Sequence, residues 1–366
     1  MKNSILIICS LFFCNLSTAM NPDIFVCDRE QDSLALVQFY GQLTTLSWDL
    51  TQPIDSFEGV TLNAEGCVEK ISITSGVAGG NFPNVSLQHI KALRIEGFGS
   101  GNCSLIVNLE LFNDIPDFCC MPQLEKLTLR MFKAGSPIPN FSNLPKLKHL
   151  EIVARAITGP LPDFSNCPEL ETLVISGYTT TWIFSCLNRR TGINGGIPNY
   201  NLPNLNFLTM RINRLNGDLP DFSNMPSTAT INVSNNYIEN IPALNTNALI
   251  NVTQNYFTFE DLLPHLDNFS NYAPQHLIPV EPLIRINDNG NPEIDIQFDA
   301  DVQGSTYIWF KYNVQIGTTT TNRLEIPDPA EVNGLYKVTV TNPGAPALTL
   351  MTEDFNVVFC EHFVGA

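Results

Sequence analysis

The residues best suited to acid–base chemistry are His149 and Glu151, which lie two positions apart. An imidazole beside a carboxylate can transfer a proton during a reaction. No candidate nucleophile accompanies the pair, and the sequence has no HExxH, G-x-S-x-G, phosphate-loop or dinucleotide-binding motif. We therefore predict that the protein is not an enzyme and that His149 and Glu151 make surface contacts.

Metal and cofactor motifs are missing from the sequence as well. The five histidines are scattered without metal-ligand spacing. The stretch Asp288–Asn291 lacks the EF-hand register, so we expect a hairpin turn there. Asp163 and Asp221 recur in a repeated P-D-F-S-N motif, which predicts turn caps. We predict neither a cofactor nor a metal.

Charge narrows the classes of partner. The formal net charge is −17, which argues against nucleic acid and anionic membrane surfaces. Residues 67–264 hold 15 acidic and 13 basic side chains, whereas residues 281–366 hold 12 acidic and 4 basic ones. Any basic binding patch is therefore expected in the middle of the chain.

The first residues have the layout of a secretory signal peptide. Lys2 precedes an apolar run from Ile5 to Phe13, and the small residues Ser17 and Ala19 follow. This pattern predicts cleavage after Ala19. The run is too short to span a bilayer, and no later stretch approaches that length. We expect a secreted or cell-surface protein without membrane insertion.

A repeat determines which elements position these side chains. The segment L-x-x-L-x-L recurs, followed in the clearest copies by G-x-(I/L)-P-x-F-S-N-x-P. Alternating apolar residues predict one short strand per copy with one face buried. Asn213, Asn236 and Asn255 at the ninth position are expected to hydrogen-bond backbone where the chain turns inward. Stacked copies would form a curved solenoid with parallel strands on its concave side. The copies start at Val68, Ile90, Leu124, Leu147, Leu170, Leu205, Thr228 and Asn247.

These motifs closely resemble the leucine-rich-repeat family, in particular the plant-type class with a G-x-I-P signature, over roughly residues 28–264. The resemblance implies that residues 20–66 form a helical N-terminal cap. Phe57-Glu58-Gly59-Val60 stands where the family usually has W-x-G-V followed by a cysteine. A Cys27–Cys67 bridge offers a substitute for the family's cap disulfide. The end of the repeats is similar to the closing repeat of bacterial secreted members.

Past about Leu277 the pattern changes to short alternating strands. Trp309 and Tyr336 match the strand-C tryptophan and the tyrosine corner of an Ig-like sandwich, and Ile296 and Val338 stand where its cysteines would be. The tail thus resembles disulfide-free Ig-like modules of bacterial surface proteins. The predicted fold is an α/β leucine-rich-repeat solenoid with a helical N-terminal cap, followed by an all-β Ig-like sandwich. The expected segments are a signal peptide (1–19), cap (20–66), repeats (67–264), linker (265–276) and sandwich (277–366).

Outward strand positions form the candidate binding face. Three arginines on one face suit a partner with carboxylates, because a guanidinium binds a carboxylate with two hydrogen bonds. The alternative is a solvated face of self-paired charges, such as Arg94 with Glu96 or Glu151 with Arg130. The candidate residues on this face are Arg94, Glu96, Arg130, His149, Glu151, Phe207 and Arg211.

Two insertions, about Gly97–Asn113 and the segment around Trp182, could enlarge the face. Trp182, Arg189 and Arg190 are of types enriched in interface hot spots; the alternative is that Trp182 covers the solenoid edge. We predict a secreted or surface scaffold that binds a protein partner in adhesion or recognition. The alternative is a carbohydrate-binding secreted protein that stacks a sugar on Phe207, so a glycan stays open as a partner.

Overall fold

The structure is a computed structural model that describes residues 27–44, 46–77, 79–97, 114–133, 135–155, 157–177, 192–298 and 302–359. The chain divides into two compact units, Met1–Arg214 with Asn224–Ala229, and Leu215–Ser223 with Thr230–Ala366.

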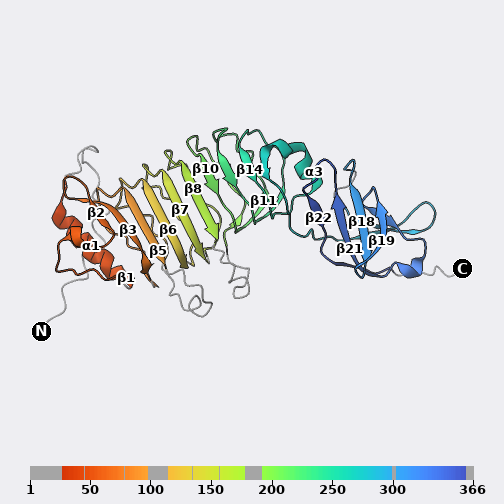
Figure 1. The fold of residues 1–366 in the computed structure, drawn as a ribbon, viewed down its shortest axis with the longest axis horizontal. Helices are drawn as coiled ribbons and strands as arrows, with labels where there is room; N and C mark the ends of the chain where they lie inside the picture. The colour runs from red at the N-terminus through yellow and green to blue at the C-terminus, as the bar shows by residue number, and fades with distance from the viewer. Residues whose placement is uncertain are drawn as a thin grey trace. The chain divides into compact units, whose positions relative to one another are not determined.

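Unit 1 is built on parallel strands that lie side by side in Figure 1. Strands β3, β5, β6, β7, β8 and β10 pair in that order and all run in the same direction. β2 pairs antiparallel with β3, and β1 pairs antiparallel with β4. The bounds are α1 (Arg29–Gln42), β1 (Leu43–Thr44), η1 (Ile54–Ser56), β2 (Val60–Leu62), β3 (Val68–Val77), β4 (Gly79–Gly80), β5 (Ala92–Gly97), β6 (Lys126–Lys133), β7 (His149–Arg155), β8 (Thr172–Gly177), β9 (Asn194–Gly195) and β10 (Phe207–Thr209).

The leucine spacing accounts for these strands. In β5, Leu93 and Ile95 are fully buried while Ala92, Arg94 and Glu96 are half-exposed, which is the alternation of a strand with one buried face. A strand lies in every predicted repeat of the chain, and all but the first begin at the third residue of the repeat. The leucine-rich repeats therefore fold as a parallel β-solenoid, as predicted.

A row of stacked aromatic rings is made by one residue from each of four consecutive repeats. The rings of Phe118, Phe141, Phe164 and Tyr200 follow one another with centroids 6.4, 6.5 and 5.8 Å apart, and all four are buried. Cys167 is a buried free thiol, as predicted, and burial raises its pKa to about 11. The thiol therefore stays protonated and acts as a small apolar side chain.

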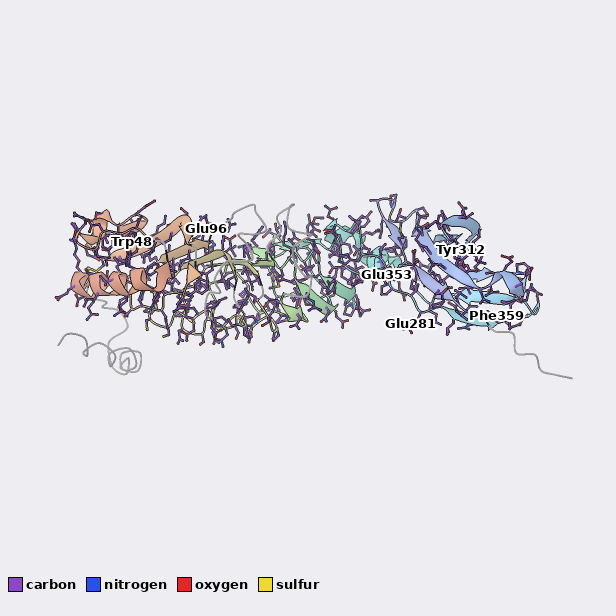
Figure 2. All side chains as sticks on the ribbon, turned by 90° about the horizontal axis from the view of Figure 1, so that it is seen from below. Trp48, Glu96, Glu281, Tyr312, Glu353 and Phe359 are labelled. Atoms are coloured by element: carbon purple, nitrogen blue, oxygen red, sulfur yellow. A yellow bond between two sulfur atoms is a disulfide. The ribbon has the colours of Figure 1, made fainter. Side chains whose placement is uncertain are left out.

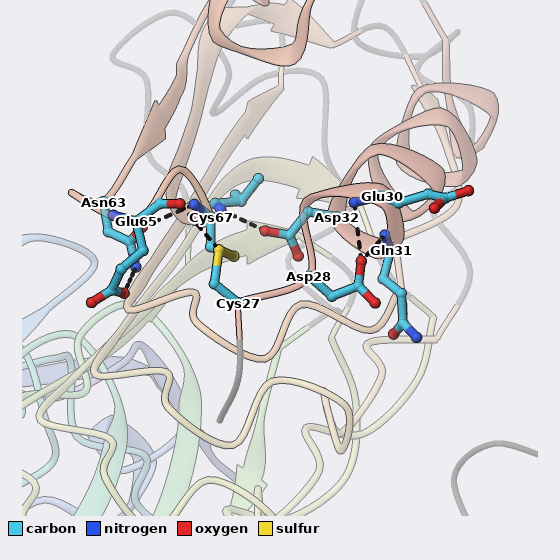
Figure 3. Close-up of a disulfide and its surroundings, with 9 residues drawn as sticks. Cys27, Asp28, Glu30, Gln31, Asp32, Asn63, Glu65 and Cys67 are labelled. Atoms are coloured by element: carbon cyan, nitrogen blue, oxygen red, sulfur yellow. Dashed lines mark hydrogen bonds between the residues drawn. A yellow bond between two sulfur atoms is a disulfide. The ribbon is translucent and has the colours of Figure 1, made fainter. Parts of the chain in front are cut away.

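The N-terminal cap is held by a disulfide and by side chains that accept hydrogen bonds from backbone amides (Figure 3). Cys27 and Cys67 are bridged, as the cap resemblance suggested. Asp28 caps α1, because its Oδ1 accepts hydrogen bonds from the amides of Glu30 and Gln31 at 3.1 Å. Asp32 is buried and accepts from the Val68 amide at 2.6 Å, and desolvation raises its pKa. The contact ties α1 to the first strand of the solenoid.

A stacked aromatic group completes the cap. Trp48, labelled in Figure 2, packs between the rings of Phe39 and Phe57 with centroids 5.8 and 5.0 Å away. Its indole Nε1 donates to the carbonyl of Glu58 at 3.0 Å, so the buried ring leaves no unsatisfied donor.

Unit 2 contains further solenoid strands. β12 (Thr230–Asn232), β14 (Leu249–Asn251) and β15 (Phe269–Asn271) are parallel. β11 (Arg214–Asp218), all but the first residue of which belongs to unit 2, pairs parallel with β13 (Tyr237–Asn240). Asn236 and Asn255 are fully buried where the chain turns behind the strands. The Asn255 amide donates to the carbonyls of Val252 and Val233, and its Oδ1 accepts from the Ile238 amide. The backbone role predicted for the ninth-position asparagines is confirmed.

The last repeat ends in helices α3 (Phe259–Leu262) and η2 (Leu263–Asn268). Thr258 and Asp261 form a capping box at the start of α3. Residues 265–276, expected as a linker, contain the end of η2 and all of β15, which pairs with β14. Asn268 donates to the Thr246 carbonyl at 2.6 Å and fixes this segment to the preceding repeat.

The C-terminal part of unit 2 has two antiparallel sheets. One has the order β16-β17-β20; in the other, β19-β18-β21-β22 lie in sequence and β23 also pairs with β21. Ile294 in the first sheet and Tyr307, Trp309, Tyr336 and Val338 in the second are buried. The bounds are β16 (Leu283–Ile286), β17 (Pro292–Asp295), β18 (Thr306–Lys311), β19 (Val314–Thr319), β20 (Arg323–Glu325), η3 (Pro329–Glu331), β21 (Gly334–Thr341), β22 (Thr349–Met351) and β23 (Phe355–Val357).

Replacing Asn255 by alanine is expected to lower the free energy of unfolding by about 2 kcal/mol, chiefly because the buried Ile238 amide loses its acceptor. Urea unfolding followed by circular dichroism measures the change. Asn216→Ala removes an exposed amide from β11 and is the matched control, with an expected change below about 0.5 kcal/mol. Equal losses in the two variants would contradict the assigned role.

Candidate functional site

The register of unit 1 places the predicted binding residues in rows across the strands. We call the outward side of β5–β8 and β10 the strand face. Because neighbouring strands pair residue by residue, side chains of successive repeats lie next to one another. One row contains Arg94, Thr128, Glu151, Val174 and Thr209, and the next contains Glu96, Arg130, Val153 and Ser176.

Four charged residues of these rows form one continuous network. Arg130 donates from Nε and Nη2 to Glu151 Oε1 at 2.8 and 2.6 Å, and its Nη1 lies 3.7 Å from Glu96 Oε1. Arg94 donates to the same Glu96 oxygen at 2.5 Å. The self-pairing considered as the alternative is therefore the arrangement that forms. A partner carboxylate would have to displace Glu96 or Glu151 from these arginines.

His149 does not pair with Glu151, because Arg130 already holds that carboxylate. The His149 Nε2 instead lies 4.0 Å from Glu171 Oε2, and both side chains are about half-exposed. Two solvated side chains at this distance make a surface contact, as predicted, but with a different partner. The residue pair that suggested acid–base chemistry is thus not assembled.

A second row of charges, which the sequence analysis missed, lies at or just before the start of each strand. Glu69, Lys91, Glu125, Lys148 and Glu171 alternate in sign from one repeat to the next. Lys91 bonds Glu69 at 2.7 Å and Lys148 bonds Glu125 at 3.2 Å, which raises the pKa of both lysines. The signal was available, since all five stand at the second position of their repeats.

Phe207 and Arg211 lie on the more neutral side of the face. Phe207 opens β10 with 43% of its surface exposed, and Arg211 is exposed just beyond the strand. In unit 2 the positions equivalent to Arg211 are Ser234 and Thr253, and two amides, Asn232 and Asn251, lie in register on β12 and β14. Trp182, Arg189 and Arg190 lie outside the described residues, as does nearly all of the insertion at Gly97–Asn113.

Among the residues that the structure describes, no group of three histidine, cysteine or acidic side chains could hold a metal ion. The Asp288–Asn291 stretch forms the expected turn, in which Asn287 Oδ1 accepts from the amides of Asn289 and Asn291. Asp163 and Asp221 cap turns, as predicted, by accepting from the amides of Ser165 and Ser223. Within the described ranges, no helix is both long and apolar enough to cross a membrane.

Comparison with known proteins bears on the fold alone. No family model matches the sequence, and no curated protein matches it significantly. A solved plant ice-binding protein has a TM-score of 0.52 at 19% identity, over 69% of this chain and 81% of its own. The structure of Listeria monocytogenes InlP has a TM-score of 0.45 at 21% sequence identity, and the match covers 74% of this chain and 76% of InlP. The LRR ectodomain of the Arabidopsis thaliana receptor kinase SOBIR1 has a TM-score of 0.37 at 21% sequence identity, and the match covers 52% of this chain and 97% of the ectodomain.

The Arg130–Glu151 pair is expected to couple by about 0.5–1 kcal/mol, since both side chains keep solvent contact. A double-mutant cycle with Arg130→Met and Glu151→Gln, measured by urea unfolding, gives this energy. The coupling should shrink as salt is added. The Lys148–Glu125 pair, with one contact at 3.2 Å, is the comparison and should couple less. Zero coupling for Arg130–Glu151 at low salt would show that the network contributes nothing to stability.

Proposed function

We propose that the protein is a secreted or cell-surface scaffold that binds a protein partner through the strand face, in adhesion or recognition. The observation that carries the proposal is the ordered row of charged side chains on parallel strands. Neighbouring groups hold Arg94, Glu96, Arg130 and Glu151 in fixed positions before any partner arrives. Ordered side chains lose less conformational entropy on binding, which favours recognition.

The network also suggests how a partner is recognised. It contains two guanidiniums and two carboxylates, so it carries no net charge and does not attract an acidic partner over long range. A complementary partner surface would carry both acidic and basic side chains, which would form new ion pairs with the arginines and glutamates of the network. His149, Phe207 and Arg211 would extend the contact, and the insertion residues Trp182, Arg189 and Arg190 would add the area that a narrow solenoid face lacks.

The proposed localisation rests on residues 1–19 and on the cap disulfide. A signal peptide would direct the chain to an oxidising compartment, where a bridge such as Cys27–Cys67 forms and persists. The same bridge in a reducing cytosol would be unusual.

We also propose the finer classes suggested by the sequence, the plant-type repeat and the Ig-like tail. The turn Gly159–Pro162 supports the first, since Gly159 has φ +85° and takes the left-handed conformation. For the second, the Tyr336 hydroxyl donates to the Val332 carbonyl at 2.7 Å, which is the contact of a tyrosine corner. Trp309 is fully buried with its Nε1 bonded to Thr319.

Affinity capture of extracellular proteins on immobilised residues 20–366 tests the proposed function. We expect two double variants, Arg130→Ala/Arg211→Ala and Trp182→Ala/Arg189→Ala, each to lower the affinity for a specific protein partner at least about tenfold. This is the loss typical of hot-spot side chains. Glu151→Gln removes the carboxylate that pairs with Arg130 and should raise the affinity for a partner that binds through carboxylates.

Lys146→Ala removes an exposed cation outside the strands and is the control, with unchanged binding expected. Thermal unfolding confirms that each variant is folded. A partner retained by both double variants would overturn the strand face as the binding surface. Capture of a glycan and of no protein would favour the carbohydrate-binding alternative.

A further inference from the structure

Three aromatic rings from three successive turns of the chain meet in unit 2. Tyr237 begins β13, Tyr256 follows the buried Asn255, and His276 lies beyond β15. The ring centroids lie 5.9 Å apart for Tyr237 and Tyr256, 6.1 Å apart for Tyr237 and His276, and 5.1 Å apart for Tyr256 and His276. The rings therefore form a closed triangle, which we call the aromatic triad.

Backbone hydrogen bonds hold the aromatic triad in place. The Tyr256 amide donates to the Ile238 carbonyl at 2.9 Å, and the His276 amide donates to the Asn255 carbonyl at 2.8 Å. The three residues of the triad are partly exposed, whereas the four stacked rings of unit 1 are buried. The triad therefore presents aromatic surface to the solvent.

Two carboxylates lie beside the aromatic triad. Glu239 is exposed on the same side of β13 as Tyr237, because side chains two residues apart in a strand share a side. Glu353, labelled in Figure 2, is also exposed, and its amide donates to the Ile278 carbonyl, two residues beyond the last ring of the triad. Burial raises the pKa of the Tyr256 hydroxyl, and repulsion from the neighbouring phenol of the triad and from Glu353 and Glu239 raises it further. The potential at the triad is therefore negative.

The charge of unit 2 determines which ligand suits the aromatic triad. Residues 215–366 contain 18 acidic and 4 basic side chains, so this stretch carries −14 of the net charge of −17. No lysine or arginine occurs from residue 215 to residue 284. The four cations that follow, each of which contacts another group of unit 2, are Arg285, Lys311, Arg323 and Lys337. The acidic surface around the triad therefore attracts cations from solution.

We propose that the aromatic triad, with Glu239 and Glu353 beside it, binds an organic cation, the ammonium group of a lysine side chain or of a small quaternary amine. An aromatic ring attracts a cation that lies within about 6 Å of its centroid. A cation about 4 Å above the centre of the triangle would lie roughly 5 Å from all three centroids and so interact with each ring. The two carboxylates would add Coulombic attraction.

Charge separates this ligand from the alternatives. A neutral sugar could stack on the tyrosines, but it would gain nothing from the 14 net negative charges of residues 215–366. An anion would be repelled by them. The site contains no residue of the strand face, so the binding of a cation here goes beyond the proposed function and does not depend on it.

An NMR titration of residues 20–366 with isotope-labelled tyrosine rings, at low salt, tests the proposal. We expect choline to shift the Tyr237 and Tyr256 signals with a dissociation constant of about 1–10 mM, because cation–π contacts at exposed sites are individually weak. Neohexyl alcohol, the uncharged carbon analogue of choline, should bind at least about tenfold more weakly. Nα-Acetyl-lysine methylamide is the second cationic probe. The tighter of the two cations identifies the source of the ammonium group as a protein side chain or a small quaternary amine.

Variants separate the ring from the charge. Tyr256→Leu removes a ring and Glu353→Gln removes a charge, and each should weaken choline binding at least about threefold, measured on the Tyr237 signal. Tyr256→Phe keeps the ring and should bind choline nearly as well as the unchanged chain. Tyr312→Leu removes an exposed ring between β18 and β19 and is the matched control, with no change expected.

Thermal unfolding verifies that each variant is folded, and Glu353→Gln, which changes an exposed side chain, keeps the test open if Tyr256→Leu does not fold. Equal binding of choline and neohexyl alcohol would overturn the proposal. The same holds if Tyr256→Leu and Glu353→Gln leave choline binding unchanged, or if about 100 mM choline shifts neither tyrosine signal. Shifts produced by glucose and not by choline would replace the cation site with a carbohydrate site.

Discussion

Backbone hydrogen bonding behind each strand is the constraint on which the solenoid depends. A chain that turns under its neighbours buries amides and carbonyls that water cannot reach, and each needs a partner. Asn236 and Asn255 meet this need from fully buried positions. The residue before each of them, Asn235 or Gln254, has a positive φ near +60°, which bends the chain inward.

These asparagines also bind one repeat to the next. Asn236 accepts from the Leu215 amide, and Asn255 accepts from the Ile238 amide. Each acceptor belongs to one repeat and each donor to the repeat before it. A repeat on its own would leave both groups unsatisfied, so the turns are stable only as a stack. The capping box at Thr258 and the helix α1 satisfy the ends in other ways.

Sequence periodicity predicted the strands well because leucines at fixed intervals can be buried in only one arrangement. Trp309 and Tyr336, which the sequence analysis singled out by their resemblance to positions of an Ig-like sandwich, are both buried. Side-chain pairing was harder to predict. His149 contacts Glu171, and not Glu151, because an arginine one strand away reaches Glu151 first. Such competition depends on distances across strands that a sequence does not contain.

The disulfide in the cap has a mechanical consequence. Cys27 and Cys67 enclose α1, and Cys67 directly precedes β3. Tension applied to the chain ahead of Cys27 would pass through the sulfur–sulfur bond into the first strand of the solenoid. The helix and turns between the two cysteines would bear none of this tension and would stay folded for as long as the disulfide is intact. The disulfide thus protects the cap from mechanical unfolding. The first element under tension is β3, which pairs with a strand on each side.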